Sequence, residues 1–483
     1  MNFNSIEFGI FLPIVFILYW FVTNRNLKFQ NFLLLLASYV FYGWWDWRFL
    51  SLIIFSSFVD YYVGFGLGRT KSPKKRKIYL WISILVNLGF LGFFKYYNFF
   101  AESFSDAFTL FGSPIDSARL NIVLPVGISF YTFQTLSYSI DVYRRKLEPT
   151  KDVVAFFAFV SFFPQLVAGP IERATNLLPQ FYKKRNFEYG KAVDGMRQIL
   201  WGLFKKVVIA DNAAMYANEI FNNYTDYSGS TLFLGAVFFA FQIYGDFSGY
   251  SDIAIGISRL FGFNLMQNFA FPYFSRDIAE FWRRWHISLS TWFRDYLYIP
   301  LGGSSGGTWM KVRNTFMIFI VSGFWHGANW TFIAWGFLNA LYFLPLLLMK
   351  RNRINTDTVA EGRFLPSIKE FIKMGITFFI TVIAWVFFRS DTIHQAFNYI
   401  IRMLSKDFFY IPSIPRGINI FEYAFVIFFV IIFLFFEWIH RNKEFGFQLE
   451  SRNKIFNWSL YLLIFVSVFL FAGKHQEFIY FQF

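Results

Sequence analysis

Residues 316–340 read FMIFIVSGFWHGANWTFIAWGFLNA and place one histidine, His326, between two apolar arms. A second histidine, His286, lies in the tryptophan-rich stretch PYFSRDIAEFWRRWHISLSTWFRDYLYIPLGG, residues 272–303. Ionisable side chains are costly at bilayer depth, so they persist there mainly where they face a cavity, a pathway or a reacting group. We therefore expect the chemistry of this chain at these two histidines.

The composition is that of a membrane protein. Of the 483 residues, 56% are hydrophobic, 24% are aromatic and only 16% are charged. Apolar runs recur along the chain, and at ~20 residues per spanning helix they predict about eleven crossings. The first run, Ile6–Thr23, lacks the basic start and the cleavage site of a signal peptide, so we expect a retained helix. We predict an all-α, polytopic integral membrane protein whose residues 1–483 form a single transmembrane domain.

Basic loops set the predicted sidedness. The net charge of +15 could indicate a nucleic-acid partner, but Lys and Arg cluster in short loops between apolar runs, as in residues 69–77 and 183–185. The positive-inside rule requires this pattern of cytoplasmic loops, so we expect no nucleic-acid partner. Basic loops also flank residues 153–170, which we therefore predict to re-enter the membrane without crossing it.

The same rule predicts a hairpin around His326. Residues 276–313 and 350–373 are both rich in Arg and Lys, so both should be cytoplasmic. The stretch 314–349 between them must then turn back, with His326 near its apex. Its first apolar arm has only about a dozen residues, too few to cross a bilayer at ~1.5 Å per residue. We expect His326 inside the membrane, where the bilayer is thinned.

Residues 280–297 form an amphipathic pattern if they are helical. Trp282, Trp285 and Trp292 fall on one aromatic stripe, whereas Arg283 and Arg284 lie away from it. Such a helix suits the membrane interface, where it could serve only as an anchor. Alternatively, Arg283 and Arg284 also attract an anionic, phosphate-bearing donor from the cytoplasm.

His326 itself allows two interpretations. A neutral imidazole can accept a hydroxyl proton at physiological pH, which would make His326 a general base. It could equally be hydrogen-bonded to a neighbouring helix, with a purely structural role. The chain contains no cysteine, so a covalent acyl intermediate would need Ser, Thr or His. Neither histidine has a second ligand at metal-binding spacing, so we predict no metal site.

Two carboxylates lie among apolar residues in FQIYGDFSGYSDIAIG, residues 241–256. Asp246 and Asp252 could mark a proton pathway. We favour a structural role, because the neighbouring Gly245, Gly249 and Ser251 indicate a break between helices that aspartate caps well.

Several longer strings, taken together, resemble one protein family. They are FPQLVAGPIER (163–173), QIYGDFSGYSDIAIGISRLFGF (242–263), FPYFSRDIAEFWRRWHISLSTWFRDYLYIPLGG (271–303), SGFWHGANWTFIAWG (322–336) and FIYFQF (478–483). The chain resembles the membrane-bound O-acyltransferase family, in the bacterial branch that contains the membrane subunit of alginate O-acetyltransferases. Apart from this resemblance, the aromatic residues of FIYFQF predict only an anchor at the membrane interface.

The resemblance implies a fold, a reaction and partners. It implies helices around a thinned central funnel, with His326 at the family's near-invariant histidine and His286 at a second functional position. It implies transfer of an acetyl group from cytoplasmic acetyl-CoA, with no bound cofactor, towards an exopolysaccharide such as alginate or another cell-surface glycan. Members of this branch act in the bacterial cytoplasmic membrane with an extracytoplasmic acetyltransferase that resembles SGNH hydrolases.

Two rival functions remain open. A D-alanyl or other acyl transferase could take its acyl group from the thioester of a carrier protein. A translocator of polysaccharide or lipid-linked sugar would also have many apolar spans, but it would more often show internal repeats and intramembrane charge pairs.

Overall fold

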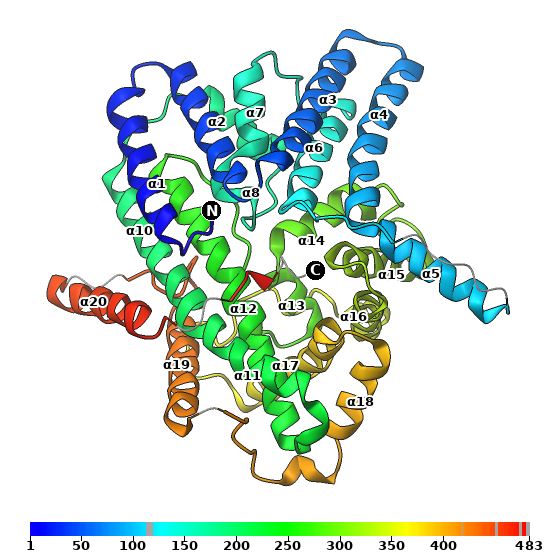
Figure 1. Cartoon of the computed structure of the whole chain (residues 1–483), viewed down its shortest axis with the longest axis vertical. Coiled ribbons are helices and arrows are strands. Elements are labelled where there is room, and N and C mark those ends of the chain that lie inside the picture. Colours follow the sequence, from blue (N-terminus) through cyan, green and yellow to red (C-terminus); the bar gives the residue numbers. More distant parts are fainter. Residues whose placement is uncertain (113–118, 418, 450–452, 473–475, 480–483) are drawn as a thin grey trace. The chain divides into compact units, whose positions relative to one another are not determined.

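The computed structural model describes residues 1–483 apart from 113–118, 418, 450–452, 473–475 and 480–483. Every regular element in this part is a helix and none is a strand, as predicted (Figure 1). The chain divides into two compact units: unit 1 holds Met1–Ala192 and Ile257–Met266, and unit 2 holds Val193–Gly256 and Gln267–Phe483. The single domain over residues 1–483 stays a prediction.

Unit 1 contains the first helices of the chain, most of them apolar. The first, α1 (Ile6–Ile17), begins at the side chain of Ser5, which accepts a hydrogen bond from Phe8 N–H, and continues as the π-helix η1 (Leu18–Val22). The others are α2 (Leu27–Gly43), α3 (Leu50–Arg69), α4 (Pro73–Leu91), α5 (Tyr97–Leu110), α6 (Ile128–Tyr143), α7 (Val153–Ser161), α8 (Phe163–Leu166) and α9 (Ala174–Leu177).

Unit 2 contains the two histidine-bearing stretches. The chain enters it within α10 (Tyr189–Leu203), and the long helix α12 (Gly229–Leu260) leaves it for unit 1 at its last turn. The other elements are η5 (Phe204–Ala210), α11 (Asp211–Asn222), α13 (Ile278–Arg284), α14 (Ile287–Phe293), α15 (Thr308–His326), α16 (Trp330–Leu348), α17 (Ile368–Arg389), α18 (Ile393–Met403), α19 (Ile420–Ile439) and α20 (Lys454–Leu470).

Six helical segments of the described chain are long and apolar enough to cross a membrane. They are Trp47–Arg69, Pro73–Thr109, Gly229–Leu260, Trp330–Leu348, Ile368–Arg389 and Ile420–Ile439. Shorter apolar helices cover Ile6–Val22, Val153–Leu166 and Lys454–Leu470. The chain is therefore a multi-pass membrane protein, as its composition predicted, while the count of about eleven crossings stays a prediction.

The predicted hairpin around His326 is confirmed, with one correction. Helix α15 ends at His326 and α16 begins three residues after Gly327, where the Asn329 side chain accepts a hydrogen bond from Thr331 N–H at 3.0 Å. However, α15 begins at Thr308 and has 19 residues, so the short first arm was wrong. The predicted arm included only the apolar residues, whereas the helix also includes the basic residues Lys311 and Arg313 in its first half. A thinned bilayer therefore does not follow from arm length.

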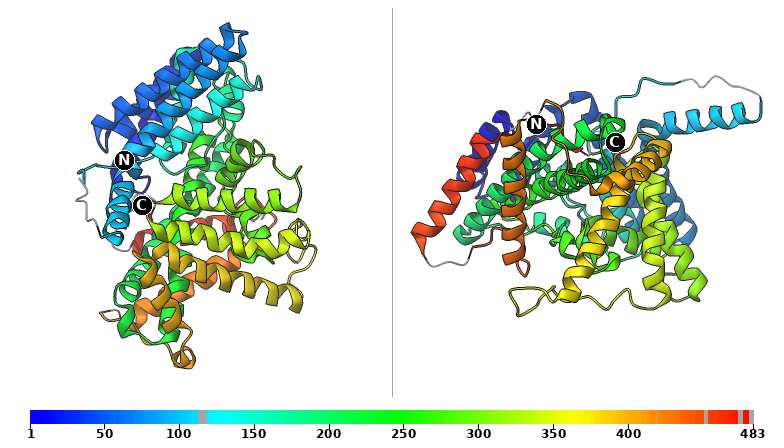
Figure 2. Two further views of the ribbon diagram at one scale, coloured as in Figure 1. Left: turned by 90° about the vertical axis from the view of Figure 1, so that its right-hand side faces the viewer. Right: turned by 90° about the horizontal axis from the view of Figure 1, so that it is seen from below.

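Helices α15, α16 and α17 lie side by side, with α16 in contact with both neighbours (Figure 2). Two glycines allow the close approach of α15 and α16. A Cβ atom on Gly323 would collide with the carbonyl oxygen of Phe332, and one on Gly336 would collide with that of Phe319. Small residues at helix contacts serve this purpose in membrane proteins.

The single amphipathic helix predicted over residues 280–297 is wrong. Helix α13 ends at Arg284, His286 takes a left-handed conformation with φ 44°, and α14 begins at Ile287. The tryptophan stripe is also not a surface feature, because Trp285 and Trp292 are buried. The stripe packs inside unit 2, and the break between α13 and α14 aims His286 into the same interior.

Candidate active site

The structure brings His286 and His326 together within unit 2. Their ring centroids lie 6.3 Å apart, and both side chains are buried, with 1% and 4% of their surface exposed. His286 comes from the bend between α13 and α14, and His326 from the last residue of α15. The two imidazoles are therefore close neighbours in the interior of unit 2.

A short backbone pairing creates the bend that holds His286. Ala270 N–H donates to the carbonyl of Arg284 at 2.9 Å, and Ile287 N–H donates to the carbonyl of Asn268 at 2.9 Å. These bonds occupy the backbone groups on both sides of His286, so the strained left-handed residue is held by its surroundings. Strained backbone of this kind is enriched at functional sites.

The side chain of Asn268 orients the His286 ring. Its Oδ1 lies 3.0 Å from His286 Nδ1 and also accepts a hydrogen bond from Ser288 Oγ at 2.8 Å, while its Nδ2 donates to Ser251 Oγ at 3.0 Å. Because an amide oxygen only accepts, Nδ1 of His286 carries the proton, and Nε2 is the nitrogen that can accept one. Asn268 therefore fixes the tautomer as well as the orientation.

Aromatic rings surround both imidazoles. Phe247 packs edge-on against His286, with the ring centroids 4.6 Å apart. The ring centroid of His326 lies 5.2 Å from that of Trp335 and 5.4 Å from that of Phe388. Burial lowers the pKa of His286 from its ordinary value to about 3, because an apolar surrounding disfavours the charged imidazolium. His286 is thus neutral at physiological pH.

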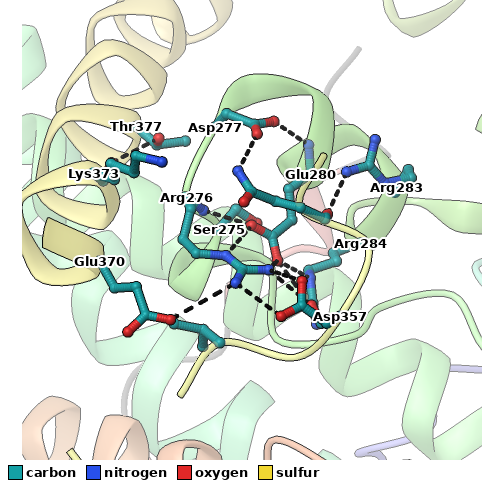
Figure 3. Close-up of polar contacts among 12 residues, drawn as sticks. Ser275, Arg276, Asp277, Glu280, Arg283, Arg284, Asp357, Glu370, Lys373 and Thr377 are labelled. Carbon is teal, nitrogen blue, oxygen red and sulfur yellow. Dashed lines mark hydrogen bonds and ion pairs between the residues drawn. The ribbon is translucent and has the colours of Figure 1, made fainter. Parts of the chain in front are cut away.

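A cluster of charges holds the other end of α13 (Figure 3). The carboxylate of Glu280 is 1% exposed and forms ion pairs with the guanidinium groups of Arg276 and Arg284, each with an N–O distance of 3.0 Å. Arg276 also contacts Asp357 at 3.0 Å and Glu370 at 3.8 Å. Two carboxylates bonded to one guanidinium raise the pKa of Arg276 despite burial and keep it charged. The cluster ties α13 to the loop before α17.

Arg283 and Arg284, the predicted donor contacts, point to this loop. Arg283 donates to the carbonyls of Asn352 at 2.7 Å and Asn355 at 2.6 Å, and Arg284 donates to that of Asp357 at 3.0 Å. The structure thus brings the two histidines together and holds the two arginines against backbone oxygens. Arg283 remains exposed on the surface.

Comparison with known proteins identifies the family. Residues 148–390 match the model of the membrane-bound O-acyltransferase (MBOAT) family, a range that includes Asn268, His286 and His326. The chain belongs to the MBOAT family. It is accordingly a membrane acyltransferase, and the resemblance noted in its sequence motifs is confirmed.

Curated relatives of this MBOAT chain extend over most of its length. The probable alginate O-acetylase AlgI of Pseudomonas syringae pv. tomato is 43% identical, over 81% of this chain and 73% of that protein. A peptidoglycan O-acetyltransferase of Helicobacter pylori is 36% identical, over 80% of this chain and 76% of that protein. A teichoic acid D-alanyltransferase of Streptococcus thermophilus is 31% identical, over 53% of this chain and 65% of that protein.

The two aspartates of α12 have a different structural role from the predicted one. Helix α12 is continuous from Gly229 to Leu260, so the predicted helix break is wrong. Asp246 pairs with Lys206 at 2.8 Å, and Asp252 pairs with Lys205 at 2.5 Å. Sequence reasoning missed these lysines, although two consecutive lysines inside the apolar run around η5 were a usable signal.

The described part of the terminal motif also lies in this region. Asp246 Oδ2 accepts a hydrogen bond from Ile479 N–H at 2.7 Å, and the Phe478 ring packs at 4.2 Å on Tyr250 of α12. Phe478 also meets Phe247, the ring that contacts His286. Phe478 and Ile479 are buried, so for them the predicted interfacial anchor is wrong. Residues 480–483 of the motif lie outside the described residues.

No group of three or more His, Cys, Asp or Glu side chains placed to hold a metal ion occurs in the part of the chain that the structure describes.

Proposed function

We propose that this MBOAT protein is an O-acetyltransferase of the bacterial cytoplasmic membrane. It passes an acetyl group from cytoplasmic acetyl-CoA across the membrane for O-acetylation of an exopolysaccharide, alginate-like or another cell-surface glycan. The observation that carries this proposal is the buried pair of His286 and His326, 6.3 Å apart, in a chain related to named O-acetylases. An extracytoplasmic, SGNH-hydrolase-like acetyltransferase is the proposed partner.

His326 acts as the general base in the proposed reaction. Its imidazole takes the proton of the acceptor hydroxyl while the hydroxyl oxygen attacks the thioester carbonyl carbon of acetyl-CoA. The carbon–sulfur bond then breaks, and the CoA thiolate takes the proton back from the imidazolium. A positioned base contributes about 10²–10⁴-fold, so the rest comes from orientation and from the exclusion of water.

His286 acts as the orienting partner. Because Asn268 fixes the proton on Nδ1, the Nε2 of His286 presents a hydrogen-bond acceptor to the site. An acceptor there can hold an amide N–H of the pantetheine arm of acetyl-CoA, which leaves the single proton of the acceptor hydroxyl for His326. The aromatic rings exclude water, which would otherwise hydrolyse the thioester.

The donor and the membrane architecture complete the proposal. The phosphates of acetyl-CoA contact Arg283 and Arg284 at the cytoplasmic surface, where Arg283 is exposed. Residues 1–483 act as one transmembrane domain with about eleven crossings around a thinned central funnel. Through that funnel the donor and the acceptor reach the histidines from opposite faces.

A second candidate is transfer of D-alanine from a carrier protein, which the similarity to a teichoic acid D-alanyltransferase favours. The two are separated by supplying the purified protein in lipid vesicles with labelled acetyl-CoA or with a D-alanyl carrier-protein thioester, with and without the extracytoplasmic partner. We expect the acyl group to be transferred from acetyl-CoA and not from the carrier-protein thioester. Transfer from the carrier alone would overturn the proposed donor.

A translocator is tested by the product in cells. Deletion of the gene should leave polymer export unchanged and remove only its ester-linked acetyl groups, measured by the amount of polymer and by the acetate released on mild alkaline hydrolysis. Loss of polymer export would contradict the acetyltransferase proposal and support translocation.

A further inference from the structure

Unit 1 contains a cavity with an unusual excess of positive charge. Its volume is about 260 Å³, and it lies between the loop that precedes α10, the end of α12 and the ring of one tryptophan. The lining residues that matter here are Lys183, Lys184, Arg185, Lys191, Arg259 and Trp20. All of them belong to unit 1, so the cavity is complete within it.

The charge of Arg185 is held by neutral groups. Its guanidinium is 6% exposed and donates to Gln180 O at 3.2 Å and Asn31 Oδ1 at 2.6 Å, and it stacks over the Phe263 ring at 4.7 Å. Burial lowers the pKa of Arg185, as expected where desolvation of the cation outweighs its stabilisation. A buried cation in this situation is stabilised by an anion that enters the cavity.

The acidic residue in the lining does not balance this charge. Glu188 pairs with Lys191 at 2.8 Å, and both side chains are about half exposed, at 57% and 49%. Lys183 and Lys184 are exposed and extend the positive surface outward from the buried Arg185. The cavity therefore presents a graded positive field that favours a doubly or singly charged anion.

Exposed aromatic side chains in the cavity lining and next to it in the chain indicate a position beside the membrane surface. Phe187 lines it and is 49% exposed, while Tyr189 at the start of α10 is 77% exposed and Phe21 at the end of η1 is 75% exposed. Exposed aromatic rings beside lysines are typical of the headgroup level of a bilayer. The basic loop 183–185 is on the predicted cytoplasmic side.

We propose that this cavity binds the phosphate of an anionic phospholipid of the cytoplasmic leaflet. A volume of about 260 Å³ is small for a whole drug-sized ligand but suits a phosphate with its headgroup. The acyl chains of the lipid then lie outside the cavity, along the exposed apolar side chains beside it. Basic pockets between membrane helices on this side bind such headgroups in other proteins.

The test uses the full-length protein in nanodiscs of phosphatidylcholine with or without phosphatidylglycerol, and native mass spectrometry to count the retained phosphatidylglycerol. The variant Lys183→Gln/Lys184→Gln removes two cavity lysines. The matched control Lys74→Gln/Lys75→Gln removes two exposed lysines at the start of α4, in the same unit and on the same predicted side. Neither pair belongs to the residues proposed for acyl transfer.

We expect retained phosphatidylglycerol in the wild-type protein and in the control, and an affinity about 25-fold lower in the cavity variant, at about fivefold per lysine near an anionic surface. Equal losses in both variants would mean general surface attraction and would overturn the site. A second arm adds inorganic phosphate to the discs. Displacement of the lipid by millimolar phosphate would overturn the lipid assignment and leave a site for soluble phosphate.

Discussion

The two ends of helix α13 have opposite chemistry. Glu280, in its first turn, holds Arg276 and Arg284 in a buried network of charges, whereas His286, two residues beyond its end, lies among aromatic rings, with Asn268 and Ser288 as polar neighbours. Buried charges tolerate little movement, because a broken pair leaves an uncompensated ion. The charged end thus fixes the helix, and the aromatic end carries His286, the residue proposed to orient the reactants.

The largest expected effect is on the aromatic end. His326→Ala removes the proposed base, so acetyl transfer from labelled acetyl-CoA, per folded protein, should fall by about 10²–10⁴-fold while donor binding changes little. The matched control is His394→Ala at the exposed start of α18, which should retain wild-type transfer. Wild-type transfer by His326→Ala would remove this residue from the reaction.

A substitution at the charged end should lower the stability of the protein. Glu280→Gln leaves Arg276 and Arg284 without their shared carboxylate, and removal of one partner from a buried pair costs about 3–5 kcal/mol. We expect a marked drop in the melting temperature in detergent. A Glu280→Gln protein as stable as the wild type would show that the network does not hold α13.

Asn268 belongs to the aromatic end, because its side chain fixes His286 beyond the end of α13. Asn268→Ala removes the oxygen that accepts from Nδ1 of His286, so the ring can rotate and change tautomer. Misplacement on this scale costs about 10²-fold, and we expect it in kcat with little change in KM. Asn268→Asp keeps an acceptor oxygen and should recover part of the activity. Equal losses in both variants would show that an acceptor oxygen at this position does not by itself orient His286.

These contacts mark the limit of what the sequence predicts. The hairpin at His326 and the choice of both histidines as candidate site residues follow from local patterns, because an ionisable residue in an apolar stretch is costly. The break at His286 does not, because it depends on the backbone bonds with Asn268 and Ala270, which lie far from it along the chain. A helical periodicity continued across residues 280–297, and tertiary pairing overrode it.

The glycines of α12 teach the same lesson. Gly245 and Gly249 were interpreted as a helix break, yet a Cβ atom on them would meet the carbonyl oxygens of Lys205 and Gly202 at 2.9 and 2.8 Å. They allow α12 to approach another segment closely, and that same approach brings Lys205 to Asp252. A single sequence does not distinguish a glycine that breaks a helix from one that allows close packing. The difference depends on which other segment lies against the glycine.

The neutral state of His286 gives a smaller, pH-dependent effect. Its pKa is about 3 in the folded protein, against ~6.5 when it is solvated. Below about pH 6.5 the unfolded chain therefore takes up a proton that the folded chain does not, so stability falls as the pH is lowered and is constant above that range. Between pH 7 and pH 5 this amounts to about 2 kcal/mol. In His286→Gln the melting temperature should fall less over this interval. An identical fall would show that another group titrates.

The smallest effect is expected where the charged network reaches the surface. Asp357 is 52% exposed and supplies Arg276 with a second carboxylate, while Glu280 stays in place. Asp357→Asn should therefore cost only about 0.2–1 kcal/mol, as exposed pairs do, and the cost should shrink at high salt. Melting curves at low and high ionic strength measure both. A loss as large as that of Glu280→Gln, unaffected by salt, would mean that the loop before α17 rather than Glu280 holds α13, and the contrast between its two ends would then have a different origin.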